Sequence, residues 1–372
     1  MNVLILGDYR APCGGNFIGS LHNLAKKFQH DGIGKLIFVF PEEKQWINLL
    51  RECGCETYFV EPNKNNSIEI IKKIVEDQSI DLIHIHFGFM QRNIVVAFAG
   101  SDNISIVIHD HMDYGVDDVM VKVLTRQIAS SMYYRLKNVS IISVMAKKSR
   151  GYFLLGKRNY YIPNGLSYIR NVNIKPDIEE IRENLNLRHK KVCLFLGWDS
   201  KRKGIDIAIQ AAQKLYQQDK TWVLAVVGYG ENPSAEVVRK LEQLSGVPDF
   251  ENFVRFLPSR EDMFSYHKMA DVYLSASRKE AFSYGLLEAI SQNTPVVVSD
   301  IEGTKWANGY DKYFEYATED AEACKNAILK AYDAKTLDSN YIKFIENYNI
   351  DLWIDSILKV YNDSKNKKRV KK

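Results

Sequence analysis

Glu280-Ala-Phe-Ser-Tyr-Gly-Leu-Leu-Glu288 follows a strand-like run, Val272 to Ser277, and opens a helix-like run, Gly285 to Ser291. A strand-to-helix junction presents free backbone N–H groups and the positive end of a helix dipole, and both suit a phosphate. The two glutamates beside this junction can accept hydrogen bonds from sugar hydroxyls. The segment therefore predicts an α/β fold and indicates a site for a sugar nucleotide.

Short apolar strands alternate with helical segments on both sides of this junction. The predicted strands are Val3–Leu6, Leu36–Phe40, Thr57–Val60, Leu82–Phe87, Ile104–His109, Ser140–Val144, Tyr160–Ile162, Val192–Leu196, Val223–Val227, Val254–Leu257, Val272–Ser275 and Val296–Ser299. In the second half the predicted helices are Ile205–Tyr216, Ala235–Leu244, Arg260–Met269, Tyr284–Ser291 and Ala321–Tyr332. Continuous apolar strands that alternate with helices are typical of parallel sheets covered on both faces.

The chain has 372 residues, which suits two domains better than one core. We expect two doubly wound, Rossmann-like domains with parallel sheets facing a central cleft, the first over residues 1–165 and the second over 166–345. Residues 346–372 are expected to form a terminal helix that packs back towards the first domain, followed by a basic tail. Ligands of such folds bind at the carboxyl ends of the strands.

The net charge of +4 is unevenly distributed, because the tail Lys365–Lys372 carries six positive charges and leaves −2 (4 minus 6) for the rest. The tail is either a solvated end or a contact with an anionic membrane surface, where each basic residue contributes about 1 kcal/mol. Nucleic-acid binding is not expected, because no basic module with interleaved aromatic residues accompanies the tail.

Five cysteines are scattered along the chain and do not form a disulfide framework, which fits a reducing compartment. No spacing of histidines or cysteines indicates a metal site, so neither a metal nor another cofactor is expected. The N-terminus has the features of a first strand and not of a signal peptide, and no apolar run is long enough for a membrane span. These features predict a cytoplasmic enzyme, peripheral at most on the inner face of the cell membrane.

Two features of the first half are candidates for a binding site. Gly14-Gly15 lies between the first strand and the first helix, where glycines allow close approach of a ligand, although an ordinary flexible loop is an alternative. His109 ends an apolar strand, a position that favours a role in a site. For His84 and His86, satisfied packing in the core is the better interpretation.

In the second half, a basic loop joins another strand to a helix. Lys201, Arg202 and Lys203 lie within Gly197–Gly204 and would place cations beside a helix N-terminus, which favours binding of a diphosphate. Such charge stabilises a departing nucleoside diphosphate. Gly228 ends the next strand and lies either under a nucleotide base or in a tight turn.

Together these motifs resemble the family 4 retaining glycosyltransferases of the GT-B fold, over nearly the whole chain and in the family's order. The motifs are Gly14-Gly15, Asp81-Leu-Ile-His-Ile-His86, His109, Ile162-Pro-Asn-Gly165, Lys203-Gly204, Gly228-Tyr-Gly230, the Glu280/Glu288 segment and Thr294-Pro-Val-Val-Val-Ser-Asp300. The glutamate segment and the Lys-Gly pair upstream of it are the most specific parts.

The resemblance implies a role for each matching residue. Glu288 would bind the ribose hydroxyls and Glu280 would lie near the donor sugar. Lys203 would bind the diphosphate, and His109 would contact the sugar. Backbone N–H groups at the start of the helix after Glu280 would bind the diphosphate or the sugar, over Ser283, Tyr284, Gly285 and Leu286. The donor site would be completed by Gly14, Gly15, Arg202 and Gly228. Family members generally need no divalent metal and retain the anomeric configuration by a front-face displacement.

Two departures from the family pattern affect the donor site. Trp198 stands where the family usually has Arg, so we expect Arg202 or Lys201 to supply the missing charge. Ile301-Glu-Gly-Thr-Lys-Trp306 replaces the usual Gly-Gly loop.

The expected activity is transfer of a sugar from a nucleotide-sugar, a UDP-sugar by preference, to a glycan or lipid-linked glycan in bacterial cell-surface polysaccharide synthesis. The alternatives are a sugar-nucleotide epimerase or hydrolase of the same fold, and a non-catalytic subunit that binds the nucleotide-sugar and a partner transferase.

Overall fold

The computed structural model describes residues 1–62, 64–111, 136–145, 159–167, 178–198, 200–260 and 262–366. The chain forms two compact units. Unit 1 comprises Met1–Ile169 and Tyr348–Lys372, and unit 2 comprises Arg170–Asn347. The boundaries expected from the sequence, after residues 165 and 345, lie close to these divisions. Each unit is described by itself below.

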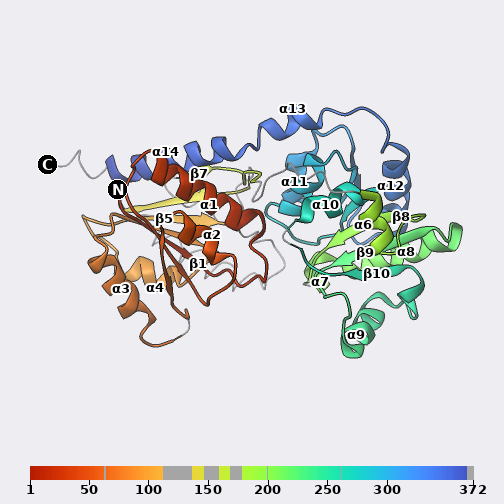
Figure 1. The fold of residues 1–372 in the computed structure, drawn as a ribbon, viewed down its shortest axis with the longest axis horizontal. Coiled ribbons are helices and arrows are strands. Elements are labelled where there is room, and N and C mark those ends of the chain that lie inside the picture. The colour runs from red at the N-terminus through yellow and green to blue at the C-terminus, as the bar shows by residue number, and fades with distance from the viewer. Residues whose placement is uncertain are drawn as a thin grey trace. The chain divides into compact units, whose positions relative to one another are not determined.

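Unit 1, drawn from red to yellow in Figure 1 with α14 in blue, is built on a parallel sheet. Its strand order is β3-β2-β1-β4-β5-β6-β7. Its elements are β1 (Val3–Gly7), α1 (Gly15–His30), β2 (Leu36–Phe40), α2 (Ile47–Glu52), β3 (Glu56–Phe59), α3 (Ser67–Asp77), β4 (Leu82–His86), α4 (Gln91–Ala97), β5 (Ser105–Asp110), β6 (Val139–Ser143), β7 (Asn159–Tyr161) and α14 (Ile350–Asn366).

Alternation along β4 divides the core of unit 1 between the two faces of its sheet. Ile83 and Ile85 point to the face packed against α3 and α4. His84 and His86 point to the other face, where the hydroxyl of Tyr361 on α14 contacts His84. Successive strand residues face opposite sides of a sheet, so both histidines lie under the layer that contains α14.

The helix α14 returns the chain to unit 1 after unit 2. Leu166 forms a parallel bridge with Asn349, and its N–H donates to the carbonyl of Tyr348 at 2.7 Å. The hydroxyls of Ser105 and Ser140 contact Ser364 near the end of the helix. Leu166, near the end of the first segment of unit 1, therefore lies beside Tyr348 and Asn349, where the chain re-enters unit 1.

Unit 2 repeats the architecture with a parallel sheet in the order β10-β9-β8-β11-β12-β13. Its elements are α6 (Ile178–Asn184), β8 (Lys191–Leu196), α7 (Ser200–Lys203), α8 (Ile205–Gln218), β9 (Trp222–Val227), α9 (Ala235–Ser245), the 3₁₀ helix η2 (Phe250–Asn252), β10 (Val254–Leu257), α10 (Met263–Met269), β11 (Val272–Ser275), α11 (Tyr284–Ser291), β12 (Val296–Ser299), the 3₁₀ helix η3 (Glu302–Ala307), β13 (Tyr313–Tyr316), α12 (Ala321–Asp333) and α13 (Tyr341–Glu346).

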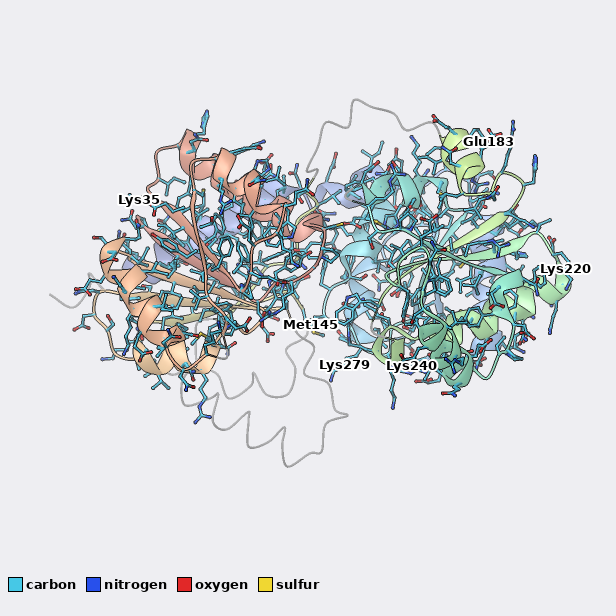
Figure 2. The ribbon with its side chains drawn as sticks, turned by 60° about the horizontal axis from the view of Figure 1, so that its bottom comes forward. Lys35, Met145, Glu183, Lys220, Lys240 and Lys279 are labelled. Atoms are coloured by element: carbon cyan, nitrogen blue, oxygen red, sulfur yellow. The ribbon has the colours of Figure 1, made fainter. Side chains whose placement is uncertain are left out.

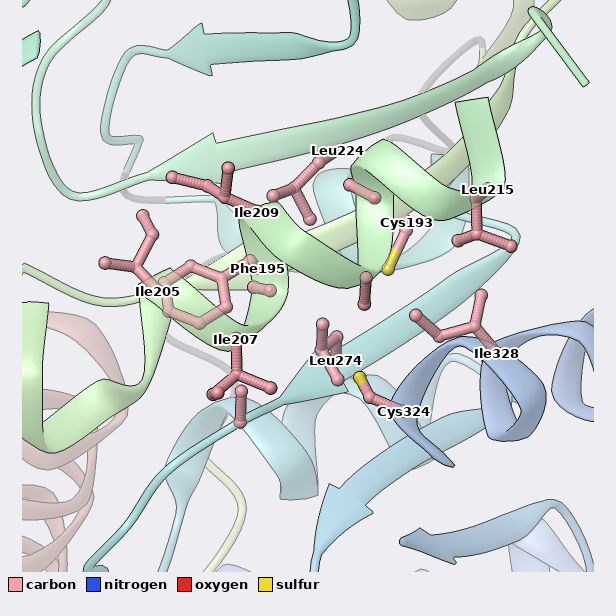
Figure 3. Packing of buried hydrophobic residues seen from close by; sticks show 14 of the residues in the cluster. Cys193, Phe195, Ile205, Ile207, Ile209, Leu215, Leu224, Leu274, Cys324 and Ile328 are labelled. Carbon is pink, nitrogen blue, oxygen red and sulfur yellow. The ribbon is translucent and has the colours of Figure 1, made fainter. Parts of the chain in front are cut away.

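Apolar side chains cover both faces of this second sheet. On one face, Cys193 and Leu274 pack with Ile328 of α12 and with the apolar stripe of α8 (Figure 3). On the other face, Leu194 packs with residues of α10 and α11 such as Leu286. Charged side chains such as Lys220 and Lys240 are exposed and project away from the ribbon (Figure 2).

Two expectations from the sequence were wrong in detail, and one strand, β13, was not predicted. Lys201, Arg202 and Lys203 lie in the short helix α7 and not in a loop. Helix α10 begins at Met263, three residues after the predicted start at Arg260, because Asp262 caps it by accepting from Ser265 N at 3.3 Å.

The five cysteines all lie within the described residues, and no two of them form a disulfide. Within the residues that the structure describes, no helix combines the length and the apolar character needed to cross a membrane. Most of the basic tail, residues 367–372, lies outside the described residues.

Candidate functional site

The carboxyl ends of β8 and β11 bring a lysine and a glutamate of unit 2 into contact. Lys203, the last residue of α7, donates from Nζ to Oε2 of Glu280 at 2.5 Å. The same oxygen lies 3.6 Å from Nη1 of Arg202. The Glu280 side chain is only 13% exposed, so its charge is balanced by the two basic groups and not by bulk water. The two most specific motifs of the sequence therefore meet at one point.

An arginine that the sequence reasoning missed holds α7 in place. The guanidinium of Arg278 donates to both carboxylate oxygens of Asp206 at 2.9 and 2.7 Å and to the carbonyl of Lys201 at 2.6 Å. It also pairs with Glu319 at 2.5 and 2.7 Å. Hydrogen bonds to these carboxylates raise the pKa of Arg278 above its ordinary value. The planar fork of an arginine makes such paired contacts with two acids, and a lysine cannot.

The N-terminus of α11 is built as the sequence indicated. Ser283 caps the helix, because its Oγ accepts from the N–H of Leu286 at 3.3 Å. Tyr284 and Gly285 form the first turn, whose N–H groups carry the positive end of the dipole. A Cβ on Gly285 would lie 2.6 Å from the hydroxyl of Tyr273, so close packing against the sheet requires glycine at this position.

The second glutamate of the motif lies one helical turn further along α11. Glu288 is 8% exposed, and its Oε2 lies 3.4 Å from Nε2 of the fully buried His267. Burial is the main cause of the raised pKa of Tyr273, and the charges of Glu280 and Glu288 raise it further. Both carboxylates therefore act on one hydroxyl beneath the start of α11.

Three glycines allow backbone segments of unit 2 to pack closely. A Cβ on Gly228 would lie 2.5 Å from the carbonyl oxygen of Gly197, and a Cβ on Gly197 would lie 2.8 Å from the side chain of Lys203. A Cβ on Gly303 would collide with the carbonyl oxygen of Glu280. The backbone at Gly228 therefore packs against the loop beside Lys203. The segment Ile301–Trp306, which departs from the family pattern, packs against Glu280 through Gly303. Trp198, which replaces the usual arginine, is 73% exposed.

The remaining predicted site residues belong to unit 1. Gly14 and Gly15 lie at the start of α1, where Gly15 has a positive φ of 55° and Tyr9 donates to the carbonyl of Gly14 at 3.0 Å. His109 is 1% exposed in β5, and within the described part of the chain neither of its ring nitrogens has a hydrogen-bond partner. Contacts of Gly14, Gly15 and His109 with a donor therefore stay predictions.

The second unit matches a known family. The family described as "Glycosyl transferases group 1" matches residues 177–348. Unit 2 is therefore similar to the group 1 glycosyltransferases over almost its whole length. The match contains every predicted donor-binding residue of unit 2, from Arg202 and Lys203 to Glu288.

Similarity to known proteins extends beyond residues 177–348. Alpha-monoglucosyldiacylglycerol synthase of Acholeplasma laidlawii is 23% identical over 67% of this chain and 63% of its own length. A Campylobacter jejuni enzyme, N,N'-diacetylbacillosaminyl-diphospho-undecaprenol alpha-1,3-N-acetylgalactosaminyltransferase, is 28% identical over 48% of this chain and 46% of its own length. The chain thus spans less than two thirds of the length of these curated relatives.

A solved structure matches almost the complete chain. Anabaena Alr3699/HepE in complex with UDP-glucose has a TM-score of 0.76 and 18% identity, and the match covers 98% of this chain and 100% of that one. The predicted GT-B fold, with two parallel-sheet Rossmann-like domains, is confirmed.

Proposed function

We propose that this protein is a glycosyltransferase that moves a sugar from a nucleotide-sugar donor to a glycan or lipid-linked glycan acceptor. The observation that carries the proposal is the Lys203–Glu280 pair beside the capped N-terminus of α11. The names of the similar proteins support it, since the Acholeplasma relative is a glucosyldiacylglycerol synthase and the Campylobacter relative is named for a diphospho-undecaprenol acceptor.

The geometry of unit 2 suits the chemistry of a leaving nucleoside diphosphate. When the glycosidic bond breaks, negative charge develops on the diphosphate. Lys203, Arg202 and the first N–H groups of α11 offer fixed positive charge at one edge of the sheet. Because Glu280 already holds Lys203, a bound diphosphate would share the ammonium group and leave the second Glu280 oxygen available to a sugar hydroxyl.

Glu288 is the candidate for ribose recognition. Its carboxylate is buried, lies on α11 and is eight residues beyond Glu280. A vicinal diol can donate two hydrogen bonds to one carboxylate, which gives a nucleoside its orientation before reaction.

The finer assignments are also part of this proposal. We infer a UDP-sugar donor, retention of the anomeric configuration with the leaving phosphate as base, and no need for a divalent metal in the transfer. The positive groups around Glu280 take the role that a metal has in other transferases. A lipid-linked acceptor in bacterial cell-surface polysaccharide synthesis would give the basic residues from Lys365 onward an anionic membrane to contact.

The deciding experiment measures donor binding and donor turnover separately. Thermal unfolding is recorded with UDP, GDP, ADP, CMP and their common sugar conjugates in EDTA, where a ligand at a hundred times its Kd stabilises the fold by about 2.7 kcal/mol. We expect stabilisation by UDP and one UDP-sugar, abolished in Glu288→Gln and kept in Glu236→Gln, whose carboxylate is exposed on α9.

Turnover then distinguishes the alternatives. Release of UDP that increases with a lipid-linked glycan acceptor supports transfer. Binding without any turnover would favour the non-catalytic subunit, and absence of binding by every nucleotide would refute the assignment of Glu288.

A further inference from the structure

A cluster of three buried histidines belongs to unit 1, and its two members on β4 have no part in the proposed transfer. His84 and His86 alternate along β4, and β5 pairs with β4 in a register that sets His109 opposite His86. One ring nitrogen of each of the three histidines lies within 4.8 Å of the others. Their rings contact one another, with centroids 4.1 Å apart for His84 and His86 and 4.8 Å apart for His86 and His109.

Each of the three histidines has a ring nitrogen without a hydrogen-bond partner among the described residues. Each of the three residues is at most 1% exposed. Nε2 of His84, Nε2 of His86 and both ring nitrogens of His109 form no hydrogen bond with any residue that the structure describes. An unpartnered buried polar atom costs about 1–3 kcal/mol, so three such residues in contact require a physical explanation.

Two outer contacts select the ring nitrogen that remains available. Nδ1 of His84 lies 2.7 Å from the hydroxyl of Tyr361, and Nδ1 of His86 lies 2.9 Å from Nε2 of His111. When each Nδ1–H donates to these partners, each Nε2 keeps an unused lone pair. Histidines that bind metals are oriented in this way by a partner on the second nitrogen.

We propose that His84, His86 and His109 bind one divalent transition metal ion of the Zn²⁺ type within unit 1. Three imidazoles with an open fourth position form a common zinc site, and imidazole also suits Co²⁺ and Ni²⁺. Bonds of about 2.1 Å in tetrahedral geometry place ligand atoms about 3.4 Å apart, so the rings need only a small inward shift from their present separation.

The protonation state of the rings agrees with metal binding. Burial is the largest cause that lowers the pKa of all three histidines well below the ordinary value, and the neighbouring histidines lower it further. Neutral imidazole is the form that binds metals. Because no described carboxylate belongs to this group of three ligands, the site would keep a net positive charge when loaded, which favours a bound hydroxide or another anion at the fourth position.

Loading is tested on the complete chain, because the buried ligands become accessible when the protein unfolds. The protein is unfolded in EDTA, refolded with Co²⁺ or Zn²⁺ and desalted, and its metal content is measured without any nucleotide. We expect one ion per chain and, for cobalt, the intense visible absorption of a tetrahedral site. Donor binding by unit 2 is measured independently, so failure of this site and failure of the proposed transferase are distinguishable.

The variants remove the ligand atom and keep the outer contact. His84→Asn and His86→Asn place an amide near the position of Nδ1 but have no atom at Nε2, and each should lower affinity at least tenfold. Tyr361→Phe should weaken binding by about 10–100-fold. His22→Asn, which changes a buried histidine of α1 outside the cluster, should have no effect.

Either of two results overturns the proposal. One is a refolded wild-type chain that holds no metal or gives no tetrahedral cobalt spectrum. The other is unchanged affinity in both asparagine variants. If those variants fail to fold, the wild-type stoichiometry and spectrum decide the matter alone.

Discussion

The two sheets of this protein share one strand order but place their polar residues differently. Counted from the first strand of each unit, both sheets run 3-2-1-4-5-6, and unit 1 adds β7. In unit 2 the charged residues Lys203 and Glu280 follow the ends of β8 and β11 and pair with each other. In unit 1 His84 and His86 lie within β4, and one nitrogen of each has no partner among the residues described. Polar groups beyond strand ends can reach a ligand from solvent, whereas those within strands require a partner inside the core.

The largest effect is expected from removal of the Lys203 ammonium group, which pairs with Glu280 in unit 2. Lys203→Met should lower sugar transfer by about 10²–10³-fold, because fixed charge at a leaving group contributes most in the transition state. The rate of UDP release under saturating donor and acceptor checks this. Lys268→Met, at an exposed position of α10, is the control and should leave the rate unchanged. Equal rates in wild type and the Lys203 variant would contradict the role of the strand-end pair.

A steric change should affect unit 2 alone. Gly303→Ala sets a methyl group against the carbonyl of Glu280 and should destabilise unit 2 by about 1–3 kcal/mol. Hydrogen exchange measured separately for the two units checks this. Gly309→Ala is the matched control, since its nearest neighbour, Phe344, would lie at an ordinary 3.5 Å. Equal exchange in both variants would mean that the loop relaxes without cost.

Substitution of His109 in β5 tests whether its buried ring nitrogens cost stability in unit 1. Leu is similar in volume to His and has no polar atom, so His109→Leu should stabilise the EDTA-treated protein by about 1 kcal/mol. Urea unfolding in EDTA checks the gain. His30→Leu changes an exposed histidine, with 87% of its side chain accessible, and should give no gain. Loss of stability in the His109 variant would show that the two nitrogens have a partner in solution. A simultaneous loss of transfer would support the predicted contact between His109 and the sugar.

The smallest effect is expected from an ordinary surface pair. Lys214 and Glu322 are 3.1 Å apart, with side chains 42% and 52% exposed. Lys214→Ala should therefore change stability by less than about 0.5 kcal/mol. Urea unfolding checks this, and a loss above 1 kcal/mol would show that the solvent-exposed pairs of unit 2 have been underestimated.

Most of the fold followed from the sequence, because buried parallel strands are continuous apolar runs. Val254–Leu257, Val272–Ser275 and Val296–Ser299 were predicted with their exact limits. β13, Tyr313–Tyr316, was missed because Glu315 interrupts an already short aromatic run. Helix α7 was missed because a four-residue helix of Ser, Lys and Arg has no apolar periodicity.

The candidate site was predictable only where its parts are local in sequence. The α11 cap and both glutamates lie within nine consecutive residues, 280–288. Arg278 was missed because its partners Asp206 and Glu319 are distant in sequence. The histidine cluster was missed although the His-x-His of β4 was noticed, because the third histidine comes from β5 and the strand register was unknown. His84 and His86 were predicted to be satisfied in the core, and each has one satisfied and one unsatisfied nitrogen.

The return of α14 to unit 1 has a consequence for synthesis of the chain on the ribosome. Unit 2 is an insertion, so all of residues 170–347 are made before the helix that covers β4 and β5 of unit 1. Domains generally fold as units while the chain emerges. The second domain can therefore fold first, while α14 and its Tyr361 do not yet cover the face of the first sheet that carries His84 and His86. During this interval the nascent sheet is open to chaperones and to metal ions, and the arrival of the last helix closes it.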